Sequence, residues 1–203
     1  MTVAPHMVDA EAYRAYYVDL GTRPEYHRIR VAPTRMTHFH PQFGEHILDL
    51  GCGSGGNCIR YAMDGCQCLG VDLSPDLIRA GREGLKDQFA AVRPHVALIV
   101  GAIEDFSTER RFQHVLITEV LEHVVDPVAV LRVAREHLDE EGQVYITAPA
   151  VRVGSISHVR GVPMDDLRKW LDEAGLKSVW HIEQPNRTNG ESYMQTVCKA
   201  VAA

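Results

Sequence analysis

The sequence predicts a single α/β domain with a doubly wound, mostly parallel sheet of seven strands, preceded by a helical segment that covers one edge of the sheet. From residue 46 onward, apolar runs of strand type alternate with runs of helical periodicity, which is typical of parallel strands linked by helices. The 203 residues are enough to bury one core, so one domain is expected. A short turn joins the last two runs, and we therefore expect at least one of these strands to be antiparallel to its neighbour.

Seven runs have the composition of strands. The middle ones are nearly continuous in apolar residues, as expected for strands that are covered on both faces. In chain order the seven runs cover residues 47–50, 68–73, 95–100, 114–120, 143–147, 176–182 and 193–201. The segment 185–191 is rich in Asn, Gly and Pro types, and it predicts the turn between the last two strands.

The segments between these strands include four with helical periodicity, at residues 58–63, 74–87, 127–142 and 163–175. Ser74 can accept hydrogen bonds from the first amide groups of its helix, and Pro75 suits the first helical position. Gly142 and Gly175 are expected to end the last two helices, because glycine readily adopts the conformation found after a helix C-terminus.

The N-terminal region, residues 1–45, contains one further helical pattern, in which Tyr13, Tyr16 and Tyr17 share one face. A helix laid over the carboxyl-terminal edge of the sheet would exclude water from a site at that edge. We therefore expect residues 1–45 to form a helical lid and residues 46–203 to form the ligand-binding domain.

The composition argues against several classes of partner. A formal net charge of -6 disfavours binding to nucleic acid. No apolar run approaches the roughly 20 residues that span a bilayer, and the first residues lack the basic and apolar regions of a signal peptide, so we expect a cytoplasmic protein without a membrane partner. The number of cysteines is odd, at five, and Cys66 and Cys68 are too close in sequence for a zinc knuckle, so we expect reduced packing residues. No feature predicts the oligomeric state.

The stretch "HILDLGCGSGGN", residues 46–57, contains the spacing G-x-G-x-x-G at Gly51, Gly53 and Gly56. A glycine turn between a strand and a helix is typical of sites for nucleotide-shaped ligands, including both nicotinamide cofactors and S-adenosylmethionine. Asp49 distinguishes between the two, because a carboxylate beside the turn would repel a pyrophosphate. The same carboxylate could meet the α-ammonium group of S-adenosylmethionine directly or through water.

Asp72 stands at the end of the second predicted strand, about 20 residues after the glycine turn begins. An acidic side chain at this place can accept two hydrogen bonds from a ribose diol, a feature that both cofactor classes share. The alternative is that Asp72 caps the following helix, and one carboxylate can serve both purposes.

Five motifs in order resemble those of class I S-adenosylmethionine-dependent methyltransferases, which have a Rossmann-like fold. They are "ILDLGCGSGG", "GVDLSPDLI", "GAIEDF", "EVLEHVVDP" and "LDEEGQVYITAP". The resemblance extends from His46 to the end of the chain. The subgroup with the pattern EVLEHVxDP includes small-molecule O-methyltransferases such as those of ubiquinone biosynthesis.

The resemblance implies how the first part of the site binds its cofactor. It implies that Asp49, Gly51 and Gly53, with Cys52 between the two glycines, surround the methionine end of S-adenosylmethionine. It also implies that Asp72 binds the ribose.

At the adenine end, the resemblance implies that Leu73 packs against the base. "GAIEDF" departs from the family pattern, since Ala102 stands where members often have an aspartate that accepts a hydrogen bond from the adenine amino group. Ile103 would still offer its backbone amide, and Glu104 or Asp105 could replace the missing carboxylate.

Two residues after the fourth strand are candidates for the chemistry. The resemblance implies that Glu119 contacts the methyl-donor pocket, and the alternative is a carboxylate placed favourably at a helix start. His123 is the candidate general base, which a hydroxyl acceptor needs and an amine does not, and the alternative is a packing role. We therefore expect S-adenosylmethionine-dependent methyl transfer to a small molecule, with oxygen favoured as the acceptor atom.

Two other functions stay open. Glu119, Glu122 and His123 spell E-x-x-E-H, which resembles the metal-binding run of small-RNA 3'-terminal 2'-O-methyltransferases, and His158 could supply a further ligand to Mg²⁺ or Mn²⁺. Metal-free small-molecule enzymes share these letters, and the acidic chain offers little attraction for RNA, so we expect no metal. Alternatively, Ala102 would suit a non-catalytic partner subunit that binds S-adenosylmethionine weakly.

Overall fold

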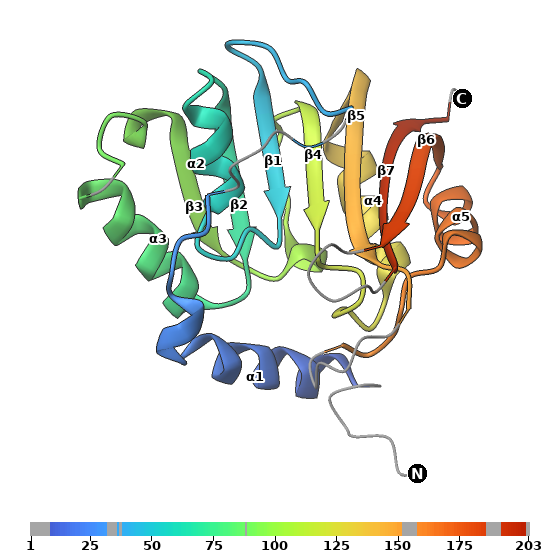
Figure 1. Cartoon of the computed structure of the whole chain (residues 1–203), viewed down its shortest axis with the longest axis horizontal. Coiled ribbons are helices and arrows are strands. Elements are labelled where there is room, and N and C mark those ends of the chain that lie inside the picture. Colours follow the sequence, from blue (N-terminus) through green and yellow to red (C-terminus); the bar gives the residue numbers. More distant parts are fainter. Residues whose placement is uncertain are drawn as a thin grey trace.

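The computed structural model describes residues 9–31, 36, 38–87, 89–151, 158–185 and 192–201. The turn predicted over residues 185–191 falls outside the described residues at positions 186–191. The strands form one seven-stranded sheet in the order β3-β2-β1-β4-β5-β7-β6 (Figure 1). They are β1 (His46–Leu50), β2 (Gln67–Asp72), β3 (Val96–Val100), β4 (Phe112–Thr118), β5 (Leu138–Pro149), β6 (Leu176–Pro185) and β7 (Ser192–Ala200).

The sheet is parallel except for β7, which is antiparallel to both β5 and β6. The expected antiparallel pairing at the end of the chain is confirmed. The order of the strands reverses between β1 and β4, and at such a switch point a crevice forms outside the carboxyl ends of the strands.

The helices cover both faces of the sheet. They are α1 (Ala10–Gly21), α2 (Gly56–Ala62), α3 (Pro75–Asp87), α4 (Pro127–His137) and α5 (Met164–Glu173), with short 3-10 turns η2 (Pro24–Tyr26), η3 (Arg93–His95) and η4 (Ile103–Asp105). Buried side chains of α2 and α3 belong to one hydrophobic cluster, and those of α4 and α5 belong to another. The doubly wound α/β fold is therefore confirmed.

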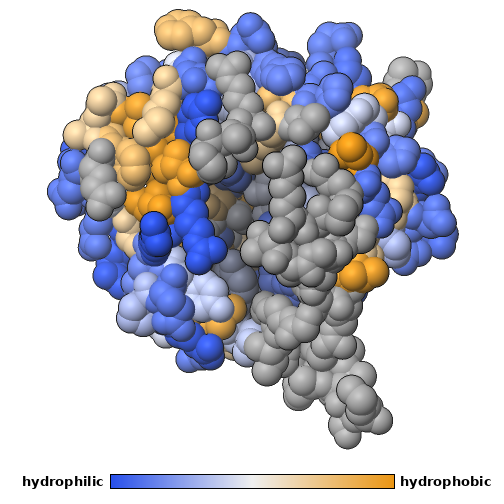
Figure 2. All heavy atoms as spheres, in the orientation of Figure 1, coloured by the Kyte–Doolittle hydropathy of each residue, from blue (hydrophilic) through white to orange (hydrophobic). Residues whose placement is uncertain are grey.

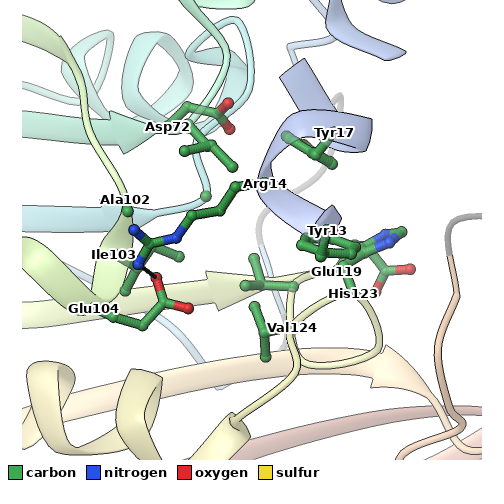
Figure 3. Close-up of a pocket in the computed structure, with 13 residues that line it drawn as sticks. Tyr13, Arg14, Tyr17, Asp72, Ala102, Ile103, Glu104, Glu119, His123 and Val124 are labelled. Atoms are coloured by element: carbon green, nitrogen blue, oxygen red, sulfur yellow. Dashed lines mark ion pairs between the residues drawn. The ribbon is translucent and has the colours of Figure 1, made fainter. Parts of the chain in front are cut away.

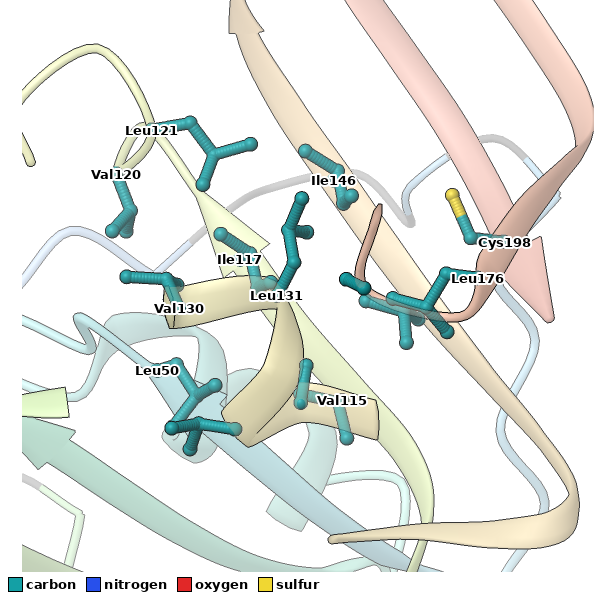
Figure 4. Close-up of a cluster of buried hydrophobic side chains, with 14 of the residues drawn as sticks. Leu50, Val115, Ile117, Val120, Leu121, Val130, Leu131, Ile146, Leu176 and Cys198 are labelled. Atoms are coloured by element: carbon teal, nitrogen blue, oxygen red, sulfur yellow. The ribbon is translucent and has the colours of Figure 1, made fainter. Parts of the chain in front are cut away.

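The two clusters follow from the alternation of side chains along each strand. Leu48 and Val115 belong to the cluster under α4 and α5, whereas their neighbours Ile47 and Leu116 belong to the cluster under α2 and α3. Figure 4 shows the first cluster, in which Leu131 of α4 packs among side chains from several strands. On the outside, hydrophilic residues cover much of the face in Figure 2, and no described helix is long and apolar enough to cross a membrane.

The start of α3 forms as its sequence predicts, and a similar cap begins α4. The Ser74 hydroxyl accepts a hydrogen bond from the amide of Leu77 at 3.3 Å, at the start of α3. Asp126 accepts one from the amide of Ala129 at 3.1 Å and is followed by Pro127, the first residue of α4.

The predicted helix over 127–142 is wrong beyond His137, because residues 138–142 belong to β5. Leu138 is buried and pairs with Phe112 of β4, and the register then shifts so that the next pair joins His114 to Gln143. At this irregularity a Cβ on Gly142 would lie 2.8 Å from the Leu138 side chain. Gly142 therefore permits a close approach inside a strand and does not end a helix.

The N-terminal helix α1 runs across the carboxyl ends of the central strands (Figure 1). Asp9 caps it by accepting a hydrogen bond from the amide of Ala12. Its last residue, Gly21, packs against the start of α3 so closely that a Cβ would lie 2.0 Å from the Ser74 hydroxyl. This contact fixes where α1 crosses the edge of the sheet.

Candidate functional site

A main pocket with about 500 Å³ of empty space lies between α1 and the carboxyl ends of β1, β2 and β4 (Figure 3). The pocket is lined by Tyr13, Arg14, Tyr17, Gly51, Asp72, Leu73, Ala102, Ile103, Glu104, Glu119, Val120, His123 and Val124.

Two further pockets adjoin the main pocket and share residues with it. The histidine pocket is lined by Tyr17, Leu20, Gly21, Tyr26, Leu77, His123 and His158. The glycine-turn pocket is lined by Tyr17, Glu25, Tyr26, Arg28, Arg30, Gly51, Cys52, Gly53, Ser54, Gly56, Asn57, Leu77, Thr118 and Glu119. Because Tyr17 lines all three, the pockets form adjoining parts of one crevice under α1.

The glycine turn at the end of β1 requires glycine at its first position. Gly51 has a φ of 79°, and a Cβ there would lie 2.5 Å from the Val120 side chain. The amides of Gly51 and Cys52 both donate to the carbonyl oxygen of Val71, at 2.8 and 3.0 Å. These bonds attach the turn to β2 and leave its backbone close to the pocket.

Asp72 joins the glycine turn to the end of β2. Its Oδ2 accepts a hydrogen bond from the amide of Gly53 at 2.8 Å, and its Oδ1 accepts one from the amide of Ser74 at 2.9 Å. Each carboxylate oxygen has a second lone pair, and the side chain lines the main pocket, so it can still accept hydrogen bonds from a ligand. Burial raises the pKa of Asp72 despite these two bonds.

The far end of the main pocket is formed by η4 and by one side chain from α1. Leu73, Ala102, Ile103 and Glu104 line this end, together with Arg14. The Arg14 guanidinium lies 3.6 Å from Oε2 of Glu104 (Figure 3). It also lies 3.0 Å from Oδ2 of Asp105. These ion pairs connect α1 to η4.

Glu119 follows β4 with a φ of 56°, a left-handed conformation that is uncommon for non-glycine residues. Its Oε1 accepts a hydrogen bond from the Thr147 hydroxyl at 3.0 Å. Burial raises the pKa of Glu119, and its hydrogen bonds with Tyr193 and Thr147 oppose this effect. The alternative of a helix-start carboxylate does not hold, since α4 begins only at Pro127.

A turn between β4 and α4 holds Glu122 and His123 beside His158. Glu122 is fully buried, and neither of its carboxylate oxygens has a hydrogen-bond partner among the described residues. Its Oε1 lies 3.8 Å from Nε2 of His123, and ligand atoms of Glu122, His123 and His158 all lie within 4.8 Å of one another. Burial and the nearby Glu119 raise the pKa of Glu122 well above its ordinary value.

Asp49 lies behind the crevice and lines none of the three pockets. It is fully buried, its Oδ1 has no hydrogen-bond partner among the described residues, and its Oδ2 is 3.7 Å from the Cys58 thiol. Burial raises the pKa of Asp49 to about 7. Asp49, which was predicted to meet an ammonium group, is therefore a buried carboxyl group that is partly protonated near neutral pH.

The structure brings most of the predicted site residues to the crevice. Gly51, Asp72, Leu73, Ala102, Ile103, Glu119 and His123 line the main pocket, and Cys52 and Gly53 line the glycine-turn pocket. Sequence reasoning missed Arg14, Arg28 and Arg30. Arg14 could have been found, because it is adjacent to Tyr13 and three residues before Tyr17 on the helix that was expected to cover the site.

Comparison with protein families supports this description. The family described as a methyltransferase domain matches residues 25–190. A ubiquinone biosynthesis O-methyltransferase of Xanthomonas oryzae pv. oryzae is 33% identical over 107 residues, which cover 51% of this chain and 43% of that protein. A tRNA U34 carboxymethyltransferase of Aeromonas hydrophila is 25% identical over 194 residues, which cover 89% of this chain and 58% of that protein. The chain thus spans about half the length of these curated relatives.

Solved structures share the fold at low sequence identity. A 1,6-didemethyltoxoflavin-N1-methyltransferase of Burkholderia thailandensis, with bound 1,6-didemethyltoxoflavin and S-adenosylhomocysteine, has a TM-score of 0.71 and is 19% identical, with 100% of this chain and 92% of that chain covered. The glycopeptide N-methyltransferase MtfA in complex with S-adenosylmethionine has a TM-score of 0.66 and is 16% identical, with coverage of 79% and 83%.

Proposed function

The chain belongs to the methyltransferase domain family, and we propose that it transfers a methyl group from S-adenosylmethionine to a small-molecule acceptor, with oxygen favoured as the acceptor atom. One observation carries this proposal. A glycine turn, a ribose-compatible carboxylate and a strained glutamate meet in one pocket at the switch point of the sheet. The ubiquinone relative, an O-methyltransferase, supports oxygen as the acceptor atom.

The residues of the crevice suit the parts of S-adenosylmethionine. Asp72 would accept hydrogen bonds from the ribose, and Leu73 and Ile103 would contact the adenine end. The methionine end would lie along the glycine-turn pocket, where the exposed Arg28 and Arg30 could pair with its carboxylate. Asp49, behind the wall, would then act on the ammonium group only through the turn or through water.

Bound S-adenosylmethionine would supply an electrophilic methyl group on a sulfonium, so the protein has to align the acceptor with the carbon–sulfur bond. His123 lines both the main pocket and the histidine pocket, and its imidazole can therefore take the proton of a hydroxyl acceptor placed between them. Glu122, 3.8 Å from His123, would stabilise the imidazolium that forms when Glu122 is ionised. Glu119 would stabilise the positive donor before transfer.

Helix α1 would act as the lid of this site. Tyr13 and Tyr17 stack with ring centroids 6.0 Å apart, and Tyr17 lies 6.3 Å from the His123 ring. Both tyrosines line the main pocket, which supports a role of α1 as the wall between this pocket and solvent. A closed α1 would exclude water from the methyl donor.

Calorimetric titration with S-adenosylhomocysteine and with NAD tests the cofactor. We expect binding of the first and none of the second. Incubation with methyl-labelled S-adenosylmethionine and a panel of phenols, alcohols and amines, followed by mass spectrometry, tests the acceptor. Binding without transfer to any acceptor class would favour the non-catalytic partner subunit, and transfer only to amines would overturn the preference for oxygen.

The cluster of Glu122, His123 and His158 favours one second candidate, a metal-assisted methyltransferase acting on RNA 2'-hydroxyl groups. The cluster fits a divalent ion, because its carboxylate and imidazole atoms lie within 4.8 Å of one another and the Glu122 oxygens have no hydrogen-bond partner among the described residues. These three residues would hold the ion, which would polarise the acceptor oxygen. Transfer to a small RNA that is lost with EDTA and restored by Mn²⁺ would establish this candidate.

A further inference from the structure

The adenine end of the main pocket has a carboxylate that the usual position lacks. Ala102 cannot accept a hydrogen bond through its side chain, but Glu104, two residues later on η4, lines the same pocket. Its neighbour Asp105 does not line the pocket, and the Asp105 side chain is 69% exposed. Of the two acidic residues on this turn, Glu104 is the one that lines the pocket.

Arg14 holds Glu104 from the opposite wall. Its guanidinium reaches from α1 to Oε2 of Glu104 at 3.6 Å (Figure 3). It also donates a hydrogen bond to Oδ2 of Asp105 at 3.0 Å. The pair with Oε2 leaves Oε1 of Glu104 as an acceptor. The Nε atom of Arg14 is buried and has no hydrogen-bond partner among the described residues. The Glu104 end of the main pocket therefore offers a ligand one N–H donor as well as one carboxylate acceptor.

Building on the proposed function, we propose that Glu104, positioned by Arg14, determines the specificity of this chain for the adenine base. The edge of adenine presents an amino donor beside a ring-nitrogen acceptor. Glu104 accepts from the amino group, and Arg14 donates to the ring nitrogen. Because Arg14 belongs to α1, recognition of the base also stabilises the closed position of that helix.

Charge explains why the pair is selective. A base with a carbonyl oxygen in place of the amino group would direct a lone pair at the Glu104 carboxylate, which has no proton to donate. Loss of a hydrogen bond to a charged group, together with this repulsion, lowers affinity by about 10- to 100-fold. Asp105 pairs with the same arginine without facing the pocket, and it therefore provides a matched control.

The test compares S-adenosylhomocysteine with S-inosylhomocysteine, which carries the carbonyl oxygen, by calorimetric titration of the full chain. We expect the wild type to prefer the adenine compound by about 10- to 100-fold. Glu104→Ala should reduce the preference to below about threefold, Glu104→Gln should retain part of it, and Asp105→Ala should retain most of it. Arg14→Ala should weaken binding of both compounds and reduce the preference.

A Glu104→Ala variant that keeps the full preference would overturn this inference and assign base recognition to the backbone. The proposed cofactor would stand in that case, because the wild type and the variant would both bind S-adenosylhomocysteine. Absence of binding in the wild type would instead overturn the cofactor and this inference together. Equal loss of the preference in Asp105→Ala and Glu104→Ala would show that the ion-pair network matters and that Glu104 does not read the base.

Discussion

Replacement of Asp49 by asparagine should stabilise the ligand-free protein at neutral pH. Asp49 is fully buried beneath the glycine turn, and its pKa rises from the ordinary 3.8 to about 7 because burial disfavours the charged form. Asparagine has nearly the same shape and no charge to bury. The wild type loses free energy of unfolding once Asp49 ionises in the unfolded chain while it stays protonated in the folded protein. The Asp49→Asn variant has no such loss.

The magnitude depends on pH. At low pH Asp49 is protonated in both the folded and the unfolded state, so its ionisation does not change the free energy of unfolding. As the pH rises above 3.8, the unfolded chain releases the proton while the folded protein retains it up to about 7, so the wild type loses stability across this window. The loss approaches about 4 kcal/mol once both states are ionised, at about 1.4 kcal/mol per tenfold change in proton affinity.

Urea titrations of the ligand-free protein at pH 5, 6, 7 and 8 measure this effect through the free energy of unfolding. We expect the advantage of Asp49→Asn over the wild type to grow by about 2 to 3 kcal/mol between pH 5 and pH 8. The other buried carboxylates are present in both proteins, so the contributions of those that do not interact with Asp49 cancel in the difference. Asp72 interacts with Asp49, and the measured difference includes this interaction. Asp172→Asn, the same chemical change at an exposed position of α5, is the matched control and should show no such growth.

Parallel stability curves for Asp49→Asn and the wild type would refute the reasoning. They would mean that Asp49 ionises as easily in the folded protein as in the unfolded chain. Water or a cation would then reach its Oδ1, which has no hydrogen-bond partner within the part of the chain that the structure describes. Asp49 would then be open to the crevice, as the sequence resemblance implied.

Three further outcomes are expected. Asp72→Ala should weaken binding of S-adenosylhomocysteine by about 1.5 to 3 kcal/mol in calorimetry, the range for hydrogen bonds to a charged group, and an unchanged affinity would remove Asp72 from the ribose site. His123→Ala should lower kcat by about 10² to 10⁴ in steady-state assays with a hydroxyl acceptor while cofactor affinity stays within about twofold, and a retained rate would make His123 structural. EDTA should leave turnover of a small-molecule acceptor intact in the same assay, and a requirement for added Mn²⁺ would point to Glu122, His123 and His158 as metal ligands.

The alternation of strands and helices could be predicted from the sequence because each element buries apolar residues at its own characteristic spacing. Ser74 and Asp126 mark helix starts by local hydrogen bonds, which sequence neighbours make regardless of the rest of the fold. The error at residues 138–142 has the opposite origin. Leu138 joins β5 because it pairs with Phe112 of β4, which is distant in sequence. The local helical pattern of residues 127–142 contains no information about that pairing.

The sequence by itself determined the class of the site, because the glycine turn and Asp72 lie at strand ends whose place in a parallel sheet follows from chain order. Only the tertiary structure decided which charges meet there. Arg14 and Asp105 are 91 positions apart, and nothing in the local pattern of either predicts that α1 brings them together. The raised pKa of Asp49 likewise depends on burial by atoms from many parts of the chain. It therefore arises only in the folded protein, where these atoms exclude water from the carboxyl group.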